Sequence, residues 1–348
     1  MAQTKTPNPP APRKVVSVTD PAVLHFNDCA NVGANLVRAA RAQGWRWGYV
    51  PPAKVRPAAT PEQLRGVGKA RYLPFLAHRR QALQRADVVH VHYATSARLL
   101  RERFMPRRPY FLHLHGTDIR TQWLDPAYHE EVRRAAGEAV GVFYTTPDNR
   151  EHALQARADA EYMPVFVNFD ELPAWQPADR PRVVFVSRWE DVKGLADQLA
   201  TAEQLANASG PDVELVGLDW GPGADAARRA GVRLIAPLPH PEYLDLLASA
   251  HVTVGQSTAI LSVSELEAMA IGVPLAASGE HYPMPDGGTP PILTGTVGET
   301  VEQVVAALAD PSATARTLDV ARWVRDHHDA ADHVAGLEAR YRAATASA

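Results

Sequence analysis

The sequence predicts an α/β protein built from two doubly wound domains. Short apolar runs rich in β-branched and aromatic residues alternate with longer amphipathic stretches, which is typical of parallel βαβ units. This alternation occurs twice, once on each side of a proline-rich segment near the middle of the chain. The chain has 348 residues, more than one hydrophobic core usually spans, so two domains of roughly 150 residues are expected.

The apolar runs predict the strands, and the stretches between them predict the helices. In the first half, strands are expected at Val15–Val18, Trp47–Val50, Val88–His92, Phe111–His115 and Gly141–Thr145, with helices that include Val32–Gln43 and Tyr128–Ala136. In the second half, strands are expected at Val183–Ser187, Val213–Gly217, Val232–Ala236, Val252–Gly255 and Pro274–Ala277, with a helix at Leu195–Asn207. A single long helix is expected at Thr314–Ala344.

Five segments follow from this pattern. Residues 1–13 are polar and proline-rich, with no apolar stretch that would make a secretory signal, and we expect a disordered tail. Residues 14–169 form the first domain and residues 182–311 the second. Residues 170–181 contain three prolines and scattered charges, which are typical of a linker. Residues 312–348 contain the terminal helix.

Composition excludes several classes of protein. The sequence is 46% hydrophobic and 22% charged, as in an ordinary globular protein. The single cysteine, Cys29, excludes an intramolecular disulfide and a zinc site of several thiolates. No apolar stretch approaches the roughly 18 residues of a membrane span. We therefore expect a cytoplasmic protein, either in solution or at the inner face of the membrane.

The net charge of −3 conceals an asymmetry between the halves. Residues 1–168 carry 24 Lys and Arg against 14 Asp and Glu, whereas residues 169–348 carry 12 against 25. A half with net charge +10 favours anionic partners, which include a phosphorylated acceptor, a membrane surface and nucleic acid. The basic segments Ala77–Arg85 and Arg101–Pro109 fit such a surface, and they equally fit solvated helix faces. No aromatic and basic alternation specifically indicates nucleic acid.

Two cations follow a predicted strand in the run VVFVSRWEDVKG, residues 183–194. Ligands of parallel sheets bind beyond the carboxyl ends of the strands, so residues in this position carry the most functional weight. Arg188 and Lys193 would stabilise the charge that a diphosphate leaving group develops in a water-poor cleft. The alternative is that both are surface charges paired with Glu190 and Asp191.

A second run, STAILSVSELEAMAIGVPLAAS at residues 257–278, predicts a loop followed by a short helix from about Ser262 or Val263. The first amides of a helix can bind an anion. Both Ser262 with Glu265 and Ser264 with Glu267 fit a capping box. We favour Ser262 as the cap, because Glu267 then points to another face and is available to ligand hydroxyls.

These residues carry a family resemblance. Arg188 and Lys193 after a strand, Gly217 after the next, and LEAMAIGVPLAAS resemble the nucleotide-binding domain of family 4 of the retaining GT-B glycosyltransferases, also described as glycosyl transferases group 1. The resemblance extends through DVVHVHY, FLHLHGTDIR and VFYTTPDN into the tail WVRDHHD. It implies the GT-B fold, two facing Rossmann-like domains with a C-terminal helix that crosses back to the first domain.

The resemblance also implies roles for individual residues. Arg188 and Lys193 would bind the donor diphosphate, Glu267 the ribose hydroxyls, and the amides near Ser262 and Val263 the distal phosphate. Gly33 would let the acceptor or a phosphate approach the backbone. The remaining implied residues are Gly217 at the donor, His115 beside the donor sugar with Asp118 nearby, and Asn31 as an acceptor or sugar contact.

One position departs from the family pattern. The family usually carries a glutamate eight residues before the ribose-binding one, and this chain has Ala259 there. Ile260 and Leu261 follow, where the family prefers glycine and an aromatic residue. The departure implies that a contact to the transferred sugar is missing.

We expect no metal and no cofactor other than the nucleotide-sugar co-substrate. His90 with His92, and His113 with His115, form i,i+2 pairs that fit a metal, but buried histidines at strand ends more often bond to backbone or carboxylate groups. The sequence has no Asp-x-Asp triplet to hold a metal-bridged diphosphate.

The expected function is transfer of a sugar from a UDP- or GDP-linked donor to a hydroxyl acceptor with retention of configuration. The alternatives are a sugar-nucleotide 2-epimerase of the same fold and a catalytically silent binding protein, for which Ala259 is the motive. A dinucleotide-dependent dehydrogenase is disfavoured, because no G-x-G-x-x-G follows the first strand of either domain.

Overall fold

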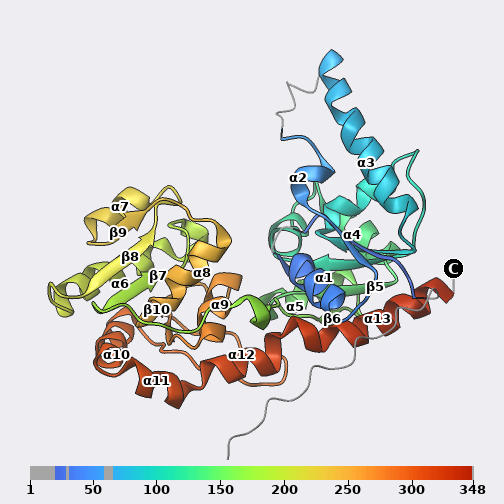
Figure 1. Ribbon diagram of the computed structural model, residues 1–348. Helices are drawn as coiled ribbons and strands as arrows, with labels where there is room; N and C mark the ends of the chain where they lie inside the picture. Colours follow the sequence, from blue (N-terminus) through green and yellow to red (C-terminus); the bar gives the residue numbers. More distant parts are fainter. Residues whose placement is uncertain (1–19, 29–30, 59–65, 347–348) are drawn as a thin grey trace, which may run out of the picture.

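The architecture is described from a computed structural model that covers residues 20–28, 31–58 and 66–346 (Figure 1). The predicted tail at residues 1–13 and the predicted strand Val15–Val18 lie outside these residues. Within them the chain forms two α/β halves, each built on one parallel sheet.

The first half contains a six-stranded sheet in the order β2-β1-β3-β4-β5-β6, with all neighbours parallel. Four strands agree with the predicted runs within a residue at each end, and β1 and β6 are not among the predicted strands. The run VLHF of β1 is entirely buried. The strands are β1 (Val23–Phe26), β2 (Trp47–Val50), β3 (Val88–His92), β4 (Tyr110–Leu114), β5 (Gly141–Tyr144) and β6 (Glu161–Tyr162).

The helices of this half connect successive strands, as right-handed parallel crossovers require. The predicted helices at residues 32–43 and 128–136 are confirmed with small shifts at their ends. The helices are α1 (Val32–Ala42), α2 (Pro52–Val55), α3 (Leu73–Gln84), α4 (His129–Glu138) and α5 (Arg150–Ala156). Short helical turns lie between them at η2 (Gly66–Tyr72), η3 (Ala94–Leu100), η4 (Thr117–Gln122), η5 (Pro147–Asn149) and η6 (Phe169–Glu171).

The second half contains a five-stranded parallel sheet in the order β11-β10-β7-β8-β9, and all five strands coincide with predicted runs. The strands are β7 (Arg182–Phe185), β8 (Glu214–Leu218), β9 (Arg233–Ile235), β10 (Val252–Val254) and β11 (Leu275–Ala276). The helices are α6 (Leu195–Ala208), α7 (Ala224–Arg229), α8 (His240–Ala248), α9 (Val263–Ile271) and α10 (Val297–Ala309), and η7 (Asp191–Lys193) precedes α6.

The prediction of one helix over Thr314–Ala344 is wrong. Three helices occupy this region: α11 (Pro311–Leu318), α12 (Val320–His328) and α13 (Ala330–Ala346). Asp319 has a left-handed φ of 51°, and Asp329 is extended. The second break is tertiary in origin, because Val167 donates its amide to the carbonyl of His328 and accepts from the amide of Ala330.

The terminal helices join the two halves, as the expected fold requires. In Figure 1, α12 and α13 run along one side of both sheets, and α13 ends under the first half. Helix α12 packs on α9, whereas α13 packs on α1. The Trp47 indole donates to Glu338 at 2.7 Å, and the Tyr341 hydroxyl bonds to Nδ1 of His90 at 2.5 Å. One hydrophobic cluster accordingly contains buried residues of both halves and of α12 and α13.

The segment predicted as a linker, residues 170–181, begins within η6. Residues 173–181 form neither helix nor strand, and the amides of Gln176 and Ala178 donate to the carbonyls of Ala248 and Ser249. The domain boundaries stay a prediction. None of the helices in the described part of the chain combines the length and apolar character needed to cross a bilayer.

Candidate active site

Loops from both halves line one cleft of about 450 Å³, which we call the cationic cleft. The loops after β4 and β5 enter it from the first half, and the loops after β7 and β10 enter it from the second. This is the carboxyl edge of both sheets, where ligands of parallel sheets bind. Its lining includes Thr117, Arg120, Thr121, Asp148, Arg188, Val192, Lys193, Gln256, Thr258, Ile260 and Tyr282.

Three cations meet in this cleft. Lys193 donates to Oε1 of Gln256 at 2.7 Å and has no bond to Asp191. Burial lowers the pKa of the Lys193 ammonium; Glu265 opposes this shift, and the charges of Arg188 and Arg120 add to it. A bound anion stabilises cations most strongly where they lie close together in a partly desolvated site.

The two arginines also have protein partners. Arg188 pairs with Glu190 at 3.1 Å, so the ion pair considered from sequence exists, and its guanidinium lies 5.1 Å over the Trp220 ring. Arg120 pairs with Asp148 and donates to Thr146 at 2.9 Å. Both arginine side chains are more than a third exposed, and both line the cleft.

Local packing places Lys193. Gly194 has a left-handed φ of 73°, and a Cβ there would lie 2.5 Å from the carbonyl oxygen of Ser257. The Ser257 amide donates to the carbonyl of Lys193 at 3.1 Å, which ties the loop after β7 to the loop after β10. Trp189 is fully buried beneath this loop and donates to the carbonyl of Leu218. Only glycine at 194 permits this approach of the two loops.

The capping assignment at α9 is confirmed. Glu265 is fully buried and forms a capping box with Ser262. One carboxylate oxygen accepts from the amide of Gln256 and the other from the amide of Ser262, each at 2.5 Å. The Ser262 amide is therefore occupied, which contradicts its predicted availability to a phosphate. The amide of Val263 is the next along the helix.

Glu267 lines a second pocket of about 470 Å³, which we call the Glu267 pocket. Glu267 is 5% exposed and its Oε1 bonds to Nε2 of His240 at 2.8 Å. Trp220 lines the same pocket, and Arg188 of the cationic cleft lies over its ring. The Glu267 pocket therefore adjoins the cationic cleft. The lining is Asn31, Val186, Leu218, Trp220, Pro237, Leu238, His240, Tyr243, Val263, Ser264 and Glu267. Apolar walls with one carboxylate suit a nucleoside.

His115 ends a chain of hydrogen bonds between imidazoles. The Thr145 hydroxyl donates to the carbonyl of Leu114, so it accepts from Nδ1 of His115 at 3.2 Å. Nε2 of His115 then accepts from Nδ1 of His92 at 2.9 Å, and Nε2 of His92 accepts from His25 at 3.0 Å. Burial lowers the pKa of all three imidazoles, which keeps them neutral. In this arrangement His115 has no nitrogen left for a ligand.

Asp118 is also committed within the protein. Its fully buried carboxylate accepts from the amides of Ala94, His115 and Gly116 at 2.9–3.0 Å. It therefore shapes the loop that carries Arg120, and the predicted sugar contact finds no geometric support.

Two of the predicted glycines have packing roles. Gly33 lies in the first turn of α1, not in a loop, and a Cβ there would lie 2.5 Å from Nε2 of His92. A Cβ on Gly217 would lie 3.0 Å from the Trp189 ring. Asn31, in contrast, lines the Glu267 pocket from the first half.

Three residues of the site were not among those predicted from the sequence: Arg120, Gln256 and His240. Arg120 ends the run FLHLHGTDIR, so its signal was a cation soon after a strand, as for Arg188. His240 begins a helix 27 residues before Glu267, and no local pattern connects the two.

Within the described part of the chain, two groups of side chains have ligand atoms close enough for a metal ion: His90, His92 and His113, and Asp28, His92 and His115. The rings of His90 and His92 stack 4.8 Å apart at an interplanar angle of 12°. A ring nitrogen binds metal in the plane of its ring, so two stacked rings cannot direct nitrogens at one ion. A metal in the second group would have to break the His92–His115 bond.

The arrangement of the two halves is shared by solved structures of low sequence identity. Sucrose-phosphate synthase from Thermosynechococcus elongatus superposes with a TM-score of 0.66 at 18% identity, over 94% of this chain and 100% of that one. HepE from Anabaena, solved in complex with UDP-glucose, superposes with a TM-score of 0.65 at 14% sequence identity, over 94% of this chain and 99% of that one. This chain has the GT-B fold. A third GT-B neighbour is a putative UDP-N-acetylglucosamine 2-epimerase from Listeria monocytogenes, at a TM-score of 0.57 and 14% identity, over 90% and 94%.

No family model matches the sequence, and no curated protein matches it. Similarity at these identities establishes the GT-B fold, whereas the reaction must be argued from the site.

Proposed function

We propose that the protein is a glycosyltransferase that moves a sugar from a UDP- or GDP-linked donor to a hydroxyl acceptor with retention of configuration. The observation that carries this proposal is the convergence of Arg120, Arg188 and Lys193 in one cleft beside the Glu267 pocket. A nucleoside fits the apolar pocket, and its diphosphate reaches the three cations.

In the proposed step, the bond between the anomeric carbon and the diphosphate oxygen breaks, and the diphosphate leaves with the electron pair. The acceptor oxygen bonds to the anomeric carbon from the same face, and its proton passes to the departing phosphate oxygen. Lys193 and the two arginines stabilise the developing negative charge, so positioning and electrostatics lower most of the barrier. The retaining outcome and membership of family 4 rest on the sequence resemblance.

The lining of the cationic cleft favours this reaction over the epimerase alternative. Epimerisation at carbon 2 needs acids and bases that can move a proton. Among the described residues that line the cleft, Asp148 is the sole carboxylate, and it is paired with Arg120. Incubation with UDP-N-acetylglucosamine in the absence of any acceptor separates the two, since an epimerase acts on the donor alone.

Donor binding is the first test. In a thermal-shift screen across nucleotide sugars, the true donor should stabilise the protein by about 2.7 kcal/mol at one hundred times its dissociation constant. Lys193→Ala and Arg188→Ala should lower turnover by at least about a hundredfold, because each removes a charged donor from the leaving group. Full activity in both variants, with their thermal stability unchanged, would exclude the diphosphate assignment.

A further inference from the structure

A pocket outside the donor site lies at the carboxyl edge of the first sheet. It has a volume of about 320 Å³, and we call it the Arg56–Arg98 pocket. Asn27 directly follows β1 and Tyr93 directly follows β3, so the pocket occupies the ligand-binding edge of this half. Its lining is Asn27, Val55, Arg56, Tyr72, Tyr93, Thr95, Ser96, Arg98, Leu99 and Glu102.

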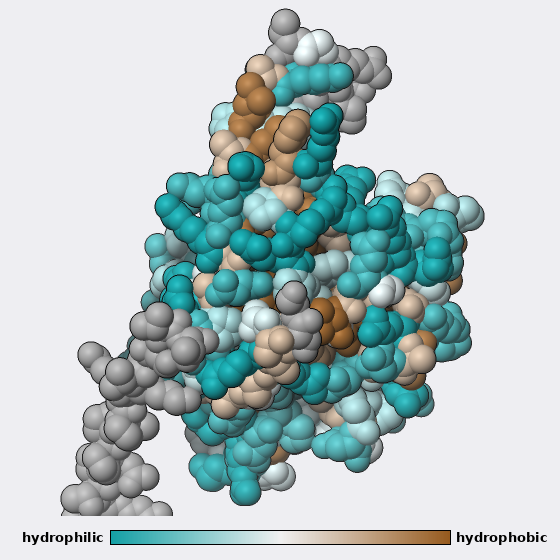
Figure 2. Space-filling view, turned by 90° about the vertical axis from the view of Figure 1, so that its right-hand side faces the viewer, coloured by the Kyte–Doolittle hydropathy of each residue, from teal (hydrophilic) through white to brown (hydrophobic). Residues whose placement is uncertain are grey.

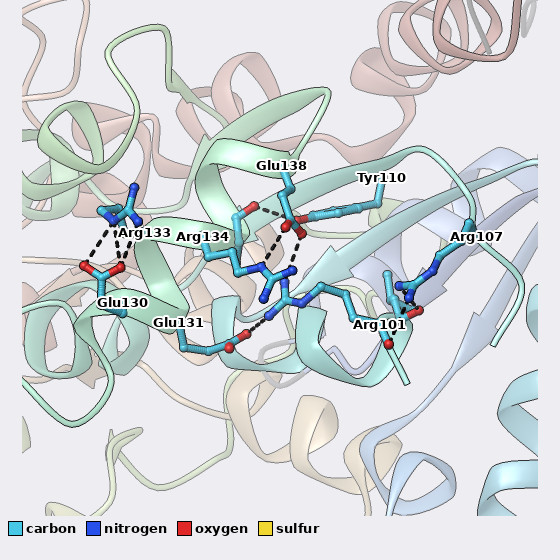
Figure 3. Close-up of polar contacts among 10 residues, drawn as sticks. Arg101, Arg107, Tyr110, Glu130, Glu131, Arg133, Arg134 and Glu138 are labelled. Atoms are coloured by element: carbon cyan, nitrogen blue, oxygen red, sulfur yellow. Dashed lines mark hydrogen bonds and ion pairs between the residues drawn. The ribbon is translucent and has the colours of Figure 1, made fainter. Parts of the chain in front are cut away.

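Two guanidinium groups of this pocket lack carboxylate partners among the residues that the structure describes, those of Arg56 and Arg98. Other arginines nearby are paired. Arg101 lies between Glu131 and Glu138 (Figure 3), and Arg79 pairs with Glu102. Glu102, the carboxylate among the described residues of this pocket, is thus already paired, and the two guanidinium groups are available to an anion.

The backbone at this edge is strained. Asn27 has a φ of 59° and Tyr93 a φ of 88°, both in a region that side chains other than glycine rarely adopt. Asn27 donates to the hydroxyl of Ser96 at 2.6 Å, and Ser96 is 7% exposed. Such backbone strain is concentrated at functional sites. Here it brings hydroxyl-bearing side chains to the pocket beside the two arginines.

The pocket is connected to the proposed reaction site. The amide of Ala94, next to Tyr93, donates to Asp118 at 3.0 Å, and Asp118 shapes the loop that carries Arg120 into the cationic cleft. The surroundings are basic, since residues 51–108 contain 13 Lys and Arg against three Asp and Glu. An anion would therefore be attracted to this edge of the first sheet.

We propose that the Arg56–Arg98 pocket binds a phosphate group of the sugar acceptor. Two guanidinium groups together with the hydroxyls of Thr95 and Ser96 match the several oxygens of a phosphate ester. This proposal rests on the proposed function and deepens it, because it assigns the acceptor to the class of phosphorylated hydroxyl compounds. The phosphate belongs either to a small soluble ester or to a lipid headgroup.

Exposed apolar side chains on the same half bear on the source of the phosphate. Helix α3 projects from the first half in Figure 1, and apolar side chains appear among hydrophilic ones on the projecting part in Figure 2. Leu73 on α3 is 62% exposed, and Phe104 is 69% exposed. A lipid source would use this surface as well, so the experiment has two arms.

The probes are glycerol 3-phosphate, titrated in a calorimeter, and vesicles of phosphatidylcholine with or without phosphatidylglycerol, followed by co-sedimentation. The double variant Arg56→Gln/Arg98→Gln should weaken the binding seen in at least one arm tenfold or more. The matched control Arg133→Gln/Arg134→Gln removes the same charge from α4, where both arginines are paired with glutamates (Figure 3). The control should bind as the wild type does.

Binding of glycerol 3-phosphate that the pocket variant loses identifies a soluble ester. Binding confined to anionic vesicles, and lost in the same variant, identifies a headgroup. The proposal is overturned if the wild type binds neither probe, or if the pocket variant and the control behave alike. UDP affinity is measured on the same samples and should be unchanged in both variants, so failure of the donor site is recorded separately.

Discussion

At the scale of single residues, the site depends on charges that lie far apart in the sequence. Lys193 and Arg188 reach the cationic cleft from the second half, and Arg120 reaches it from the first. Burial, together with the nearby charges of Arg188 and Arg120, lowers the pKa of Lys193, and an anion that bridges the three cations would stabilise the charged ammonium. The proposed donor site therefore requires both halves.

Arg120→Gln tests that requirement. We expect turnover to fall by roughly a hundredfold or more, because one charged donor to the leaving group is lost. UDP affinity should fall less, because Arg188, Lys193 and the Glu267 pocket remain. Steady-state kinetics and calorimetry measure the two effects, and Arg133→Gln, on the exposed face of α4, serves as the control. Wild-type turnover in Arg120→Gln would restrict the leaving-group site to the second half.

The pair of His240 and Glu267 predicts a pH dependence of stability. The hydrogen bond to Glu267 raises the pKa of His240 above its ordinary value of 6.5. Stability from the pair is thus fully present below that value and is lost as pH rises through the raised pKa. We expect the difference in unfolding free energy between the wild type and His240→Gln to be larger at about pH 5.5 than at about pH 8.5. Denaturant titrations measure it, and a difference independent of pH would contradict the pairing.

At the scale of elements, two capping boxes of the same kind lie in different surroundings. Glu265 at the start of α9 is fully buried and holds the amides of Gln256 and Ser262. Glu299 at the start of α10 is exposed and bonds to Thr296. The first box fixes the loop that places Gln256 beside Lys193, so it also positions the site.

Replacing each capping glutamate by alanine should separate burial from capping. Glu265→Ala leaves the buried amide of Gln256 and the partly buried amide of Ser262 without partners, at about 1–3 kcal/mol each, so a loss of roughly 2–6 kcal/mol is expected. Glu299→Ala exposes the Thr296 amide to water and should cost about 0.5–1 kcal/mol. Urea unfolding of both variants measures the losses. Equal losses would show that the burial of Glu265 adds nothing to its cap.

At the scale of the whole molecule, α12 and α13 bind the two halves into one structure. Helix α12 packs on α9 of the second half and α13 on α1 of the first. The contacts of Trp47 with Glu338 and of His90 with Tyr341 add buried polar bonds. Because one hydrophobic cluster includes residues from all these elements, the GT-B halves share part of their core.

Truncation tests this coupling. Removal of residues 330–348 deletes Val334, Leu337 and Tyr341, each at most 2% exposed. Loss of a large buried side chain typically costs about 2–5 kcal/mol of stability. The combined loss from these three side chains therefore approaches the free energy of unfolding of a typical protein, about 5–15 kcal/mol. We expect the truncated chain to lose its cooperative thermal transition in circular dichroism and to aggregate on size exclusion. Removal of residues 345–348 alone should change neither the thermal transition nor the size-exclusion profile. If the chain that lacks residues 330–348 still folds cooperatively, the two halves do not depend on a shared core.

Much of the fold is readable from local pattern. Buried parallel strands have short apolar runs that need no partner to be recognised, so nine of the eleven described strands coincide with predicted runs. The cation pair after β7 and the capping box at α9 are also local, because a strand end and a helix start are each defined within a few residues. The terminal helix was misjudged, since its break at Asp329 arises from bonds to Val167, distant in sequence.

The sequence by itself determined the order of strands and helices, the positions of Arg188, Lys193 and Glu267 at carboxyl ends and helix starts, and the basic character of the first half. Only the tertiary structure decided which of the predicted residues face a cavity. It directed His115 and Asp118 to internal hydrogen bonds, and it added Arg120 and His240 to the site. The physical reason is that the partner of a side chain depends on which loops the two sheets bring together. Contacts between loops that are distant in sequence produce no periodic pattern in the sequence.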